Sequence, residues 1–391
     1  MISERRSIAG SGARALTSGR QAFAHIDWFL LAAALAISLV GLVTMHSFSA
    51  ENVFFDRQII WICAALGVFF LASLVDYSFL RRTSIIFSFF IFIVVLLTLI
   101  YLFGSVVKGG QNRFDLGFFA LQPSDPAKLL LVMVLAKYFA RRHIEIKHVR
   151  HILVSGGYAF ALFALVFFQP DLGSSIIIAS IWLGMVLVAG ISWRHLAIIF
   201  VTAAVVAGGL WHWGLHPYQK DRILTFIHPL ADIHGTGYNA YESTVAVGSG
   251  EVLGKGIGYG TQSKLQFLPE YQTDFIFAAY AEEWGFLGVV FLLGLFGVVI
   301  IRILTFALHA GDNFDTLFGV GLAIYFTAQF IVHVGMNLGL LPITGTTLPF
   351  MSYGGSHLIT EYAALGILMA MRRHARPTIQ ARDETAFVEA L

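Results

Sequence analysis

Two acidic residues stand directly before a strongly apolar stretch of the chain. Glu270 and Asp274 belong to Leu268-Pro-Glu-Tyr-Gln-Thr-Asp274, and an apolar run from Phe275 to Tyr280 follows at once. A carboxylate in this position can simply favour the positive end of the helix that the run predicts. It can also serve as a general base, because the edge of an apolar environment tunes carboxylate pKa values. The residues alone leave both interpretations open.

A second group places opposite charges at the start of another apolar run. In Ser124-Asp-Pro-Ala-Lys128, the spacing puts Asp125 and Lys128 on one face of a helix. Ser124 can cap this helix, and Pro126 fits its first turn. The group is therefore either a structural cap with an ion pair or a site for an anionic ligand, formed by Lys128 with Arg113 on the preceding loop.

Glycines dominate the segment from Gly248 to Gly260. It does not match the nucleotide-binding phosphate loop, because the spacing of its glycines is one residue short and a glycine follows Lys255 where that motif needs Ser or Thr. One interpretation is a turn that uses positive φ angles. The other is a backbone that approaches a bulky phosphorylated or sugar ligand, with Lys255 near the anionic part. Elsewhere, Asp171 in a Gln-Pro-Asp-Leu-Gly turn is expected to cap a helix.

The composition identifies the elements that must position these residues. Of 391 residues, 57% are hydrophobic and 12% are charged, whereas soluble domains carry roughly 25% charged residues. So few charges cannot cover a soluble surface, and the sequence predicts a polytopic membrane protein. The net charge of +2 comes without a strongly basic face, which argues against a nucleic-acid partner. A single cysteine, Cys63, excludes an intramolecular disulfide and a cysteine-rich metal site.

Charged residues mark the ends of the predicted membrane spans. An uncharged run of about 18 residues or more can cross a bilayer core of about 30 Å. We therefore expect an all-α polytopic membrane protein with about ten transmembrane helices. The expected spans are 28–45, 58–75, 83–107, about 125–140, 151–170, 172–193, 195–219, 284–301, 317–340 and 355–371. The segment at about 214–275, between the seventh and eighth spans, is too long for a simple connection and is expected to form an ordered cap outside the cell.

The distribution of Lys and Arg predicts the orientation of the chain. With the N-terminus inside, 16 of the 25 basic residues fall on the cytoplasmic side and seven on the outer side, as the positive-inside rule requires. We expect a cytoplasmic tail at 1–25, a transmembrane domain at 26–373 and a second cytoplasmic tail at 374–391. The basic opening lacks a cleavage site after a short apolar core, so the first span is expected to remain as an anchor.

Several blocks of sequence together resemble the SEDS family (shape, elongation, division and sporulation), which includes RodA, FtsW and SpoVE. The blocks occur in the family's order over about residues 26 to 373, and jointly they are specific. Gly260-Thr-Gln262, leading through Phe267 into Leu268-Pro-Glu270, looks more like the RodA branch than FtsW. The other matching blocks are Gln111-Asn-Arg113, Gln122-Pro-Ser-Asp-Pro-Ala-Lys128, Gln169-Pro-Asp-Leu-Gly173, Tyr218-Gln219 with Arg222, Gly248-Ser-Gly250, Gly254-Lys-Gly256, Thr273-Asp-Phe275 and Leu348-Pro-Phe-Met-Ser-Tyr-Gly-Gly-Ser356.

The chain also departs from the family pattern at a few positions. Phe114 stands where Trp is usual after Arg113, and Asp125 replaces a Glu, which keeps the charge but shortens the reach by one methylene. The remaining departures are Glu242 for Gln, Tyr271-Gln272 for a pair ending in His, and His357 for Ser.

The resemblance implies a peptidoglycan glycosyltransferase that polymerises lipid II into β-1,4 glycan strands at the outer face of the bacterial cytoplasmic membrane during elongation. It implies that Asp274 is the general base or the ligand of an activating divalent cation such as Mg²⁺ or Mn²⁺. Arg113, Lys128 and Lys255 would hold the pyrophosphate, with Asp125 and Glu270 also in the substrate site. No other cofactor is implied.

The resemblance further implies a class B penicillin-binding protein, a transpeptidase, as partner, together with other components of the elongation machinery. Two alternatives belong to other functional classes. A flippase for the lipid-linked precursor would share the membrane fold and the intramembrane ion pair, but it needs access from both sides. A noncatalytic scaffold for the transpeptidase would have no essential carboxylate.

Overall fold

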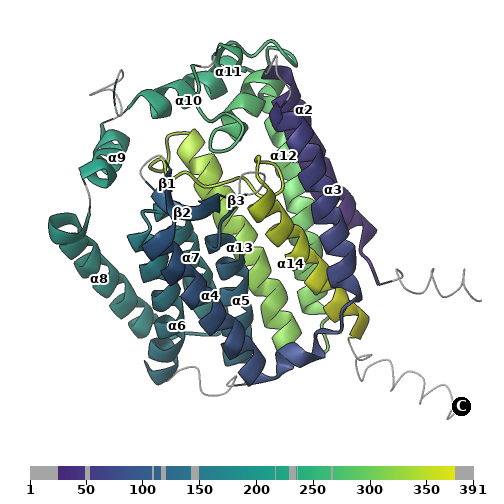
Figure 1. The fold of residues 1–391 in the computed structure, drawn as a ribbon, viewed down its shortest axis with the longest axis vertical. Coiled ribbons are helices and arrows are strands. Elements are labelled where there is room, and N and C mark those ends of the chain that lie inside the picture. The colour runs from purple at the N-terminus through teal and green to yellow at the C-terminus, as the bar shows by residue number, and fades with distance from the viewer. Residues whose placement is uncertain are drawn as a thin grey trace, which may run out of the picture.

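The computed structural model describes residues 25–48, 53–107, 110–115, 120–141, 149–215, 217–228, 235, 237–265 and 267–374. Helices make up most of this part of the chain, as the sequence predicts, and they are arranged as a bundle (Figure 1). The long helices are α2 (Trp28–Phe48), α3 (Val53–Leu74), α4 (Thr83–Phe103), α5 (Ser124–Ala140), α6 (Val149–Phe168), α7 (Leu172–Val188), α8 (Trp193–Gly209), α12 (Ile276–Leu308), α13 (Asn313–Asn337) and α14 (Gly355–His374).

Each expected span overlaps one of these long helices. In the described part of the chain, 7 of them are long and apolar enough to cross a membrane, namely α2, α3, α4, α6, α8 together with the π-helix that continues it to Gly214, α12 and α13. Helices α5 and α7 have only 17 residues each, and α14 carries Glu361, Arg372 and Arg373. A multi-pass membrane protein is therefore confirmed, while the count of ten spans stays a prediction.

Some helices extend beyond the uncharged runs that predicted them. Helix α3 begins at Val53 and includes Asp56, and α12 begins at Ile276 and contains the buried Glu282 and Glu283. A helix can therefore begin before the uncharged run that predicts it. Because the backbone of α12 leaves the helical conformation at Gly285, the part of α12 after this residue overlaps the expected span 284–301.

The segment after α4 forms strands, which the all-α prediction did not include. A three-stranded antiparallel sheet contains β1 (Ser105–Val107), β2 (Gly110–Asp115) and β3 (Ala120–Leu121) in the order β1-β2-β3. Val107 pairs with Gly110, and Phe114 pairs with Leu121. These strands are too short to stand out by residue alternation, and their pairing satisfies backbone groups that the end of α4 leaves without partners.

Shorter helices follow the long bundle helices in several places. The 3-10 helix η1 (Tyr77–Arg81) precedes α4, and α8 continues into the π-helix η2 (Leu210–Gly214). The predicted loop contains α9 (Pro217–Ile227), α10 (Tyr238–Ser249) and α11 (Thr261–Lys264). Of these, α10 packs against α12 and α13. Helical structure in this segment agrees with the expected ordered cap, although its predicted aromatic anchoring is limited: Tyr271 is buried, whereas Phe226, Tyr241 and Phe267 are exposed.

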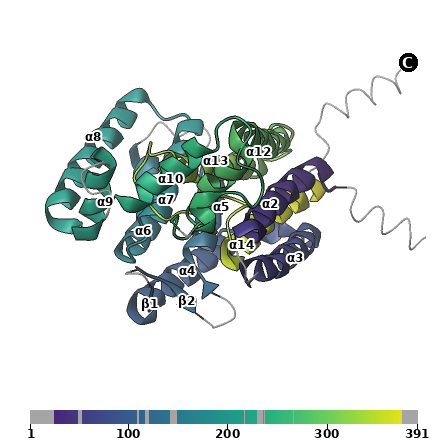
Figure 2. The same cartoon turned by 90° about the horizontal axis from the view of Figure 1, so that it is seen from above.

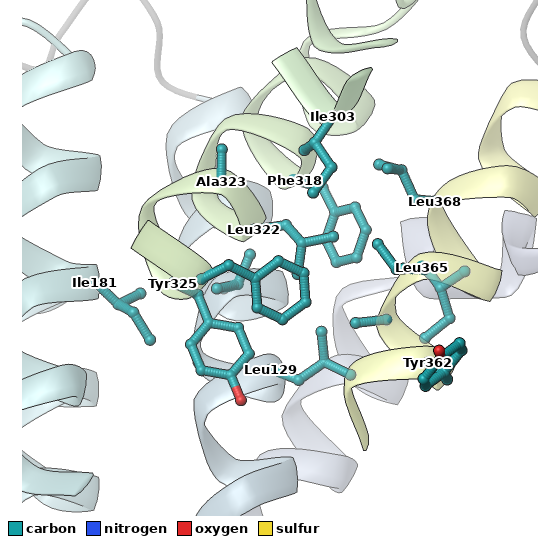
Figure 3. Packing of buried hydrophobic residues seen from close by; sticks show 14 of the residues in the cluster. Leu129, Ile181, Ile303, Phe318, Leu322, Ala323, Tyr325, Tyr362, Leu365 and Leu368 are labelled. Carbon is teal, nitrogen blue, oxygen red and sulfur yellow. The ribbon is translucent and has the colours of Figure 1, made fainter. Parts of the chain in front are cut away.

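Helices α5 and α13 lie at the centre of the bundle (Figure 2). Helix α13 contacts α5, α7, α12 and α14, whereas α3 packs along α14 and α2 packs along α12. Side chains from α5, α7, α12, α13 and α14 meet in the core, with Tyr325 and Leu322 between Leu129, Ile181 and Leu365 (Figure 3). Helix α8 has no buried residue, as expected for a helix whose surface faces lipid.

Small residues let the central helices approach closely. A side chain at Gly321 of α13 would press against Val132 of α5 and Met185 of α7. A side chain at Gly184 of α7 would press against Ile324 of α13. Packing of this kind stabilises helix pairs in lipid, where burial of apolar surface gives little driving force. These contacts fix α5, which carries Asp125 and Lys128 at its first turn, against the centre of the bundle.

Candidate functional site

Asp274 lies in a tight turn directly before α12. The main-chain carbonyl of Glu270, which has φ +52, accepts hydrogen bonds from the amides of Thr273 and Asp274, each at 3.1 Å. The side chain of Asn337, at the end of α13, donates to the main-chain carbonyl of Asp274 at 3.0 Å. Phe275 is the N-cap residue of α12, and its own side chain makes no capping hydrogen bond. The turn before α12 is thus held by its own main-chain hydrogen bonds and by the side chain of Asn337.

The Asp274 carboxylate faces the loop between α13 and α14. Asp274 is half-buried, and a Cβ atom built on Gly345 would lie 3.4 Å from its Oδ2 atom. Gly345 has φ +71, a conformation that glycine adopts at little cost. A glycine here therefore keeps the loop close to the carboxylate without placing a side chain over it.

The loop between α13 and α14 connects the Asp274 turn with the rest of the bundle. Ser352 donates through Oγ to the carbonyl of Thr273 at 2.8 Å, and the amide of Tyr353 donates to the carbonyl of Gln272 at 2.8 Å. From α3, the buried Gln58 donates to the Ser352 carbonyl at 3.1 Å. These polar contacts hold the turn and the loop as one unit.

Helices α13 and α14 hold the same loop from the other side. Gln329 donates to the carbonyl of Thr347 at 3.0 Å, and His333 forms a 2.7 Å hydrogen bond with the carbonyl of Thr346. The Glu361 carboxylate of α14 accepts from the amide of Phe350 at 2.7 Å. Backbone groups of an irregular loop are tolerated at membrane depth only when protein groups satisfy them in this way.

Asp171 caps a helix, as the sequence predicts. It is the N-cap residue of α7, and its carboxylate accepts from the amide of Ser174 at 2.9 Å. Its second oxygen accepts from the side chain of Gln122 at 3.1 Å. The following glycine, Gly173, lies against Thr346, where a side chain would collide. The capped turn therefore packs on the loop that faces Asp274.

Lys128 and Asp125 form a buried ion pair. Their charged atoms are 3.0 Å apart, and their side chains are 4% and 6% exposed. Glu361 and His357 of α14 lie within electrostatic range of both residues, and His357 contacts the carbonyl of Ser352 at 3.0 Å. The pair therefore reaches the Asp274 turn indirectly, through His357 and Ser352.

The predicted cap at the start of α5 is wrong. Pro123 occupies the N-cap position and makes no side-chain hydrogen bond, so Ser124 is already the first helical residue. Its hydroxyl instead donates to Asp171 at 3.4 Å. The carboxylate that accepts this hydrogen bond belongs to the N-cap residue of α7. Because α7 is distant in the sequence, the local spacing around Ser124 cannot reveal this contact.

Lys255 contacts α12 through a buried carboxylate. Its Nζ atom lies 2.7 Å from Glu282, which is fully buried and also accepts from the amide of Gln262 at 3.1 Å. The neighbouring Glu283 accepts from the amide of Gly258. Neither glutamate was among the predicted site residues, although two acidic side chains at the end of an apolar run were a visible signal.

The glycine-rich segment fills a break in α12. At Gly285 the backbone leaves the helical conformation with φ 64 and ψ −165. The carbonyls of Glu282 and Glu283 accept from the amides of Lys255 and Gly256, each at 3.0 Å. On the far side of the break, Phe286 and Leu287 donate to carbonyls of the same segment at 2.9 and 3.1 Å. The positive φ angles of Gly254, Gly256 and Gly258 confirm the predicted glycine-rich turn.

Arg113 lies in β2, with its backbone paired to Ser105, and its side chain lies outside the described part of the structure. Another arginine of the family pattern, Arg222, lines a cavity of about 300 Å³. The lining also includes Gly339 and Ile343. The segment between α13 and α14, which the Asp274 carboxylate faces at Gly345, therefore also contributes to this cavity.

The described residues contain no group of three or more His, Cys, Asp or Glu side chains arranged to hold a metal ion. A Mg²⁺ ion can be held by one or two carboxylates together with substrate phosphates, so the divalent cation expected at Asp274 stays a prediction.

Comparison with known proteins places these features in a family. Residues 21–377 match the cell cycle protein family FtsW/RodA/SpoVE. The chain is 34% identical over 353 residues to the peptidoglycan glycosyltransferase MrdB of Escherichia coli K12, covering 90% of this chain and 95% of MrdB. It is also 34% identical over 363 residues to stage V sporulation protein E of Bacillus subtilis, covering 90% of this chain and 98% of that protein.

Solved structures agree with this relationship. A chain of a peptidoglycan synthase complex, studied for its coordination of polymerization and crosslinking, matches with a TM-score of 0.76 and 32% identity, covering 89% of this chain and 98% of that one. The rod shape determining protein RodA of Thermus thermophilus matches with a TM-score of 0.68 and 29% identity, covering 89% and 97%. Because the family pattern spans nearly the whole chain and the fold agrees, the chain belongs to the FtsW/RodA/SpoVE family.

Proposed function

We propose that the chain is a peptidoglycan glycosyltransferase of the RodA branch, which polymerises lipid II into β-1,4 glycan strands. Family membership and the named activity of the Escherichia coli relative support this function. The observation that carries the proposal is the setting of Asp274, whose half-buried carboxylate lies in a fixed turn against the loop at Gly345. A carboxylate held in this way is suited to accept a proton.

The reaction joins an acceptor lipid II to the growing glycan chain. The oxygen of the acceptor 4-hydroxyl attacks the anomeric carbon of the chain, and the bond from that carbon to the pyrophosphate oxygen breaks with inversion. Asp274 takes the hydroxyl proton, and undecaprenyl pyrophosphate leaves with the electron pair of the broken bond. A positioned general base of this kind contributes about 10² to 10⁴ in rate.

Positive side chains hold the pyrophosphate in this proposal. Arg113 and Arg222 are the first candidates, because arginine binds phosphate oxygens through paired charge-assisted hydrogen bonds. Lys128 and Lys255 already contact carboxylates at 3.0 and 2.7 Å, so each would have to exchange a protein partner for a phosphate. Asp125 therefore controls how available Lys128 is, and Glu270 shapes the turn that presents Asp274.

The proposed topology has ten spans, with a cytoplasmic tail at 1–25, a transmembrane domain at 26–373 and a second cytoplasmic tail at 374–391. The segment at about 214–275 then lies outside the cytoplasmic membrane, on the side where α12 begins. Asp274 would lie near the outer boundary of the bilayer, and the lipid tails of the substrate would remain in the membrane. The positive-inside distribution of Lys and Arg supports this orientation.

We also propose a class B penicillin-binding protein as partner, with the chain working in the elongation machinery. The similarity to a chain of a peptidoglycan synthase complex supports a transpeptidase partner. Polymerisation and crosslinking would then be divided between two proteins that meet at the outer face of the membrane.

Incubation of the purified chain with lipid II tests the function, with and without the candidate transpeptidase. We expect glycan ladders on a gel, with the chain length or rate increased by the partner. If translocation of lipid II across vesicles were found without any polymer, the flippase alternative would replace this proposal. If neither activity appeared but the transpeptidase was stimulated, the scaffold alternative would be favoured.

A further inference from the structure

A second cavity lies at the end of the bundle opposite to the Asp125 end of α5. It has a volume of about 340 Å³, within the range of roughly 300 to 1,000 Å³ that is typical of small-molecule sites. The helices α4, α5 and α6 that enclose it contact one another in pairs and lie together in both views of the fold (Figures 1 and 2). None of the residues proposed to act on lipid II lines this cavity.

The cavity is positively charged. Lys137, Arg141 and Arg150 line it, and among its described lining residues none is acidic. Arg141 is exposed at the C-terminal cap of α5, and Arg150 is exposed in the first turn of α6. Lys137 is half-buried and lies over the ring of Phe314, with 5.6 Å from Nζ to the ring centroid. Two exposed guanidinium groups and one half-buried ammonium group therefore line the same cavity.

The remaining lining combines two tyrosines with apolar side chains. Tyr138 and Tyr158 belong to this lining, and the hydroxyl of Tyr138 is 2.8 Å from Nδ1 of His151. Phe90 packs edge-on against Tyr158 with 5.3 Å between ring centroids. Phe87, by contrast, is 49% exposed on the outward side of α4. A ligand with a charged head and an apolar body would match this arrangement.

We propose that this cavity binds an anionic phospholipid, with the phosphate at Arg141 and Arg150 and an acyl chain along Phe87 and Val154. Three observations support this ligand. The cavity lies at an end of the bundle where charged residues cluster, and its described lining contains several positive side chains and no acidic residue. An apolar wall on membrane helices is also exposed at this cavity. Basic pockets between membrane helices recognise anionic head groups in this way. Because α5 leads from this cavity to Asp125 and Lys128, the bound lipid would stabilise the helix that carries the central ion pair.

Native mass spectrometry of the purified full-length chain in a nonionic detergent tests the proposal. The probes are dioleoyl phosphatidylglycerol and dioleoyl phosphatidylcholine, which share their acyl chains and differ in head-group charge. We expect the phosphatidylglycerol to bind at least about tenfold more tightly, since basic residues near a membrane surface attract an anionic lipid. The double variant Arg141→Gln/Arg150→Gln should lose this preference.

A matched double variant provides the control. Arg57→Gln/Arg194→Gln removes the same charge from two exposed arginines that do not line the cavity, and it should keep the preference. Phe87→Ala should weaken both lipids severalfold, because it removes part of the apolar wall. Without added lipid, the melting temperatures of all the variants should equal that of the unmodified chain.

Three results would overturn the proposal. Equal loss of preference in both double variants would indicate a general effect of surface charge. Persistence of the preference in Arg141→Gln/Arg150→Gln would place the lipid elsewhere. Displacement of phosphatidylglycerol by an equal concentration of inorganic phosphate, together with no effect of Phe87→Ala, would indicate a free-phosphate site. A photoreactive phosphatidylglycerol on the unmodified chain gives a second readout, with crosslinks expected on α4, α5 or α6.

Discussion

Asp274 shows how a residue that is easy to find in the sequence acquires its chemistry from distant contacts. The acidic residue before the apolar run was visible from its position alone. The contacts around it were not, because the contact with Gly345 and the hydrogen bond from Asn337 to the Asp274 carbonyl come from the end of α13 and the loop that follows it. Local sequence therefore predicted the candidate carboxylate but left its role undecided.

Replacement of Asp274 by Asn tests the proposed base directly. The amide keeps the size of the side chain and much of its hydrogen-bonding ability, so stability should fall by about 1 kcal/mol or less. An amide cannot accept the hydroxyl proton, and polymerisation of lipid II should fall by at least about 10². Gel polymerisation and a thermal melt measure the two effects separately.

Glu270→Gln is the matched control for this change. The turn depends on the main-chain carbonyl of Glu270, and its side chain accepts from the Thr273 hydroxyl at 3.3 Å. A glutamine can still accept that bond, so measurable polymerisation should remain. Activity near the parental level in Asp274→Asn would contradict the mechanism and would favour the flippase or scaffold alternatives.

The buried pair at the start of α5 was correctly predicted as a pair, but its surroundings were not. Spacing placed Asp125 and Lys128 on one helical face, whereas their neighbours Glu361 and His357 come from α14. The pair can be purely structural, or Lys128 can bind an anionic ligand, and these two interpretations predict different effects of mutation.

Single and double neutral replacements of Asp125 and Lys128 separate these interpretations. Asp125→Asn or Lys128→Met alone should cost about 3–5 kcal/mol, because each leaves a buried charge without its partner. The double variant should recover most of the stability in a thermal melt. If Lys128 binds pyrophosphate, the folded double variant should still fail to polymerise lipid II. Recovery of polymerisation would exclude the ligand role.

The glycine-rich segment gives a prediction about the break in α12. Gly254 has φ +80, and a Cβ atom there would collide with the carbonyl of Glu283. Gly254→Ala should therefore destabilise the protein by more than the roughly 1–2 kcal/mol that a left-handed conformation costs a residue with a side chain. Gly248→Ala is the control, because a Cβ atom at Gly248 has no neighbour within 4 Å. Equal melting temperatures for the two variants would argue that the segment does not hold the break.

Composition predicted the architecture of the complete chain better than its details. Few charges and long apolar runs indicated a helical membrane protein, and the expected spans overlap the observed long helices. The sequence did not predict the three-stranded sheet, the central place of α13 or the break at Gly285. Each depends on which distant segments satisfy backbone groups or fit against a glycine, so no local window contains the information.

Orientation in the membrane is the last property that we predict for the complete chain. In a background in which Cys63 is replaced by Ala, Leu253→Cys and Arg194→Cys place single thiols at exposed positions. With both termini in the cytoplasm, a membrane-impermeant thiol reagent added to intact spheroplasts should label the cysteine at 253 but not the one at 194. Permeabilised cells provide the control, because both positions should then react. Labelling of 194 alone in intact cells would reverse the orientation and place Asp274 at the cytoplasmic face, where it could not polymerise glycan strands outside the membrane.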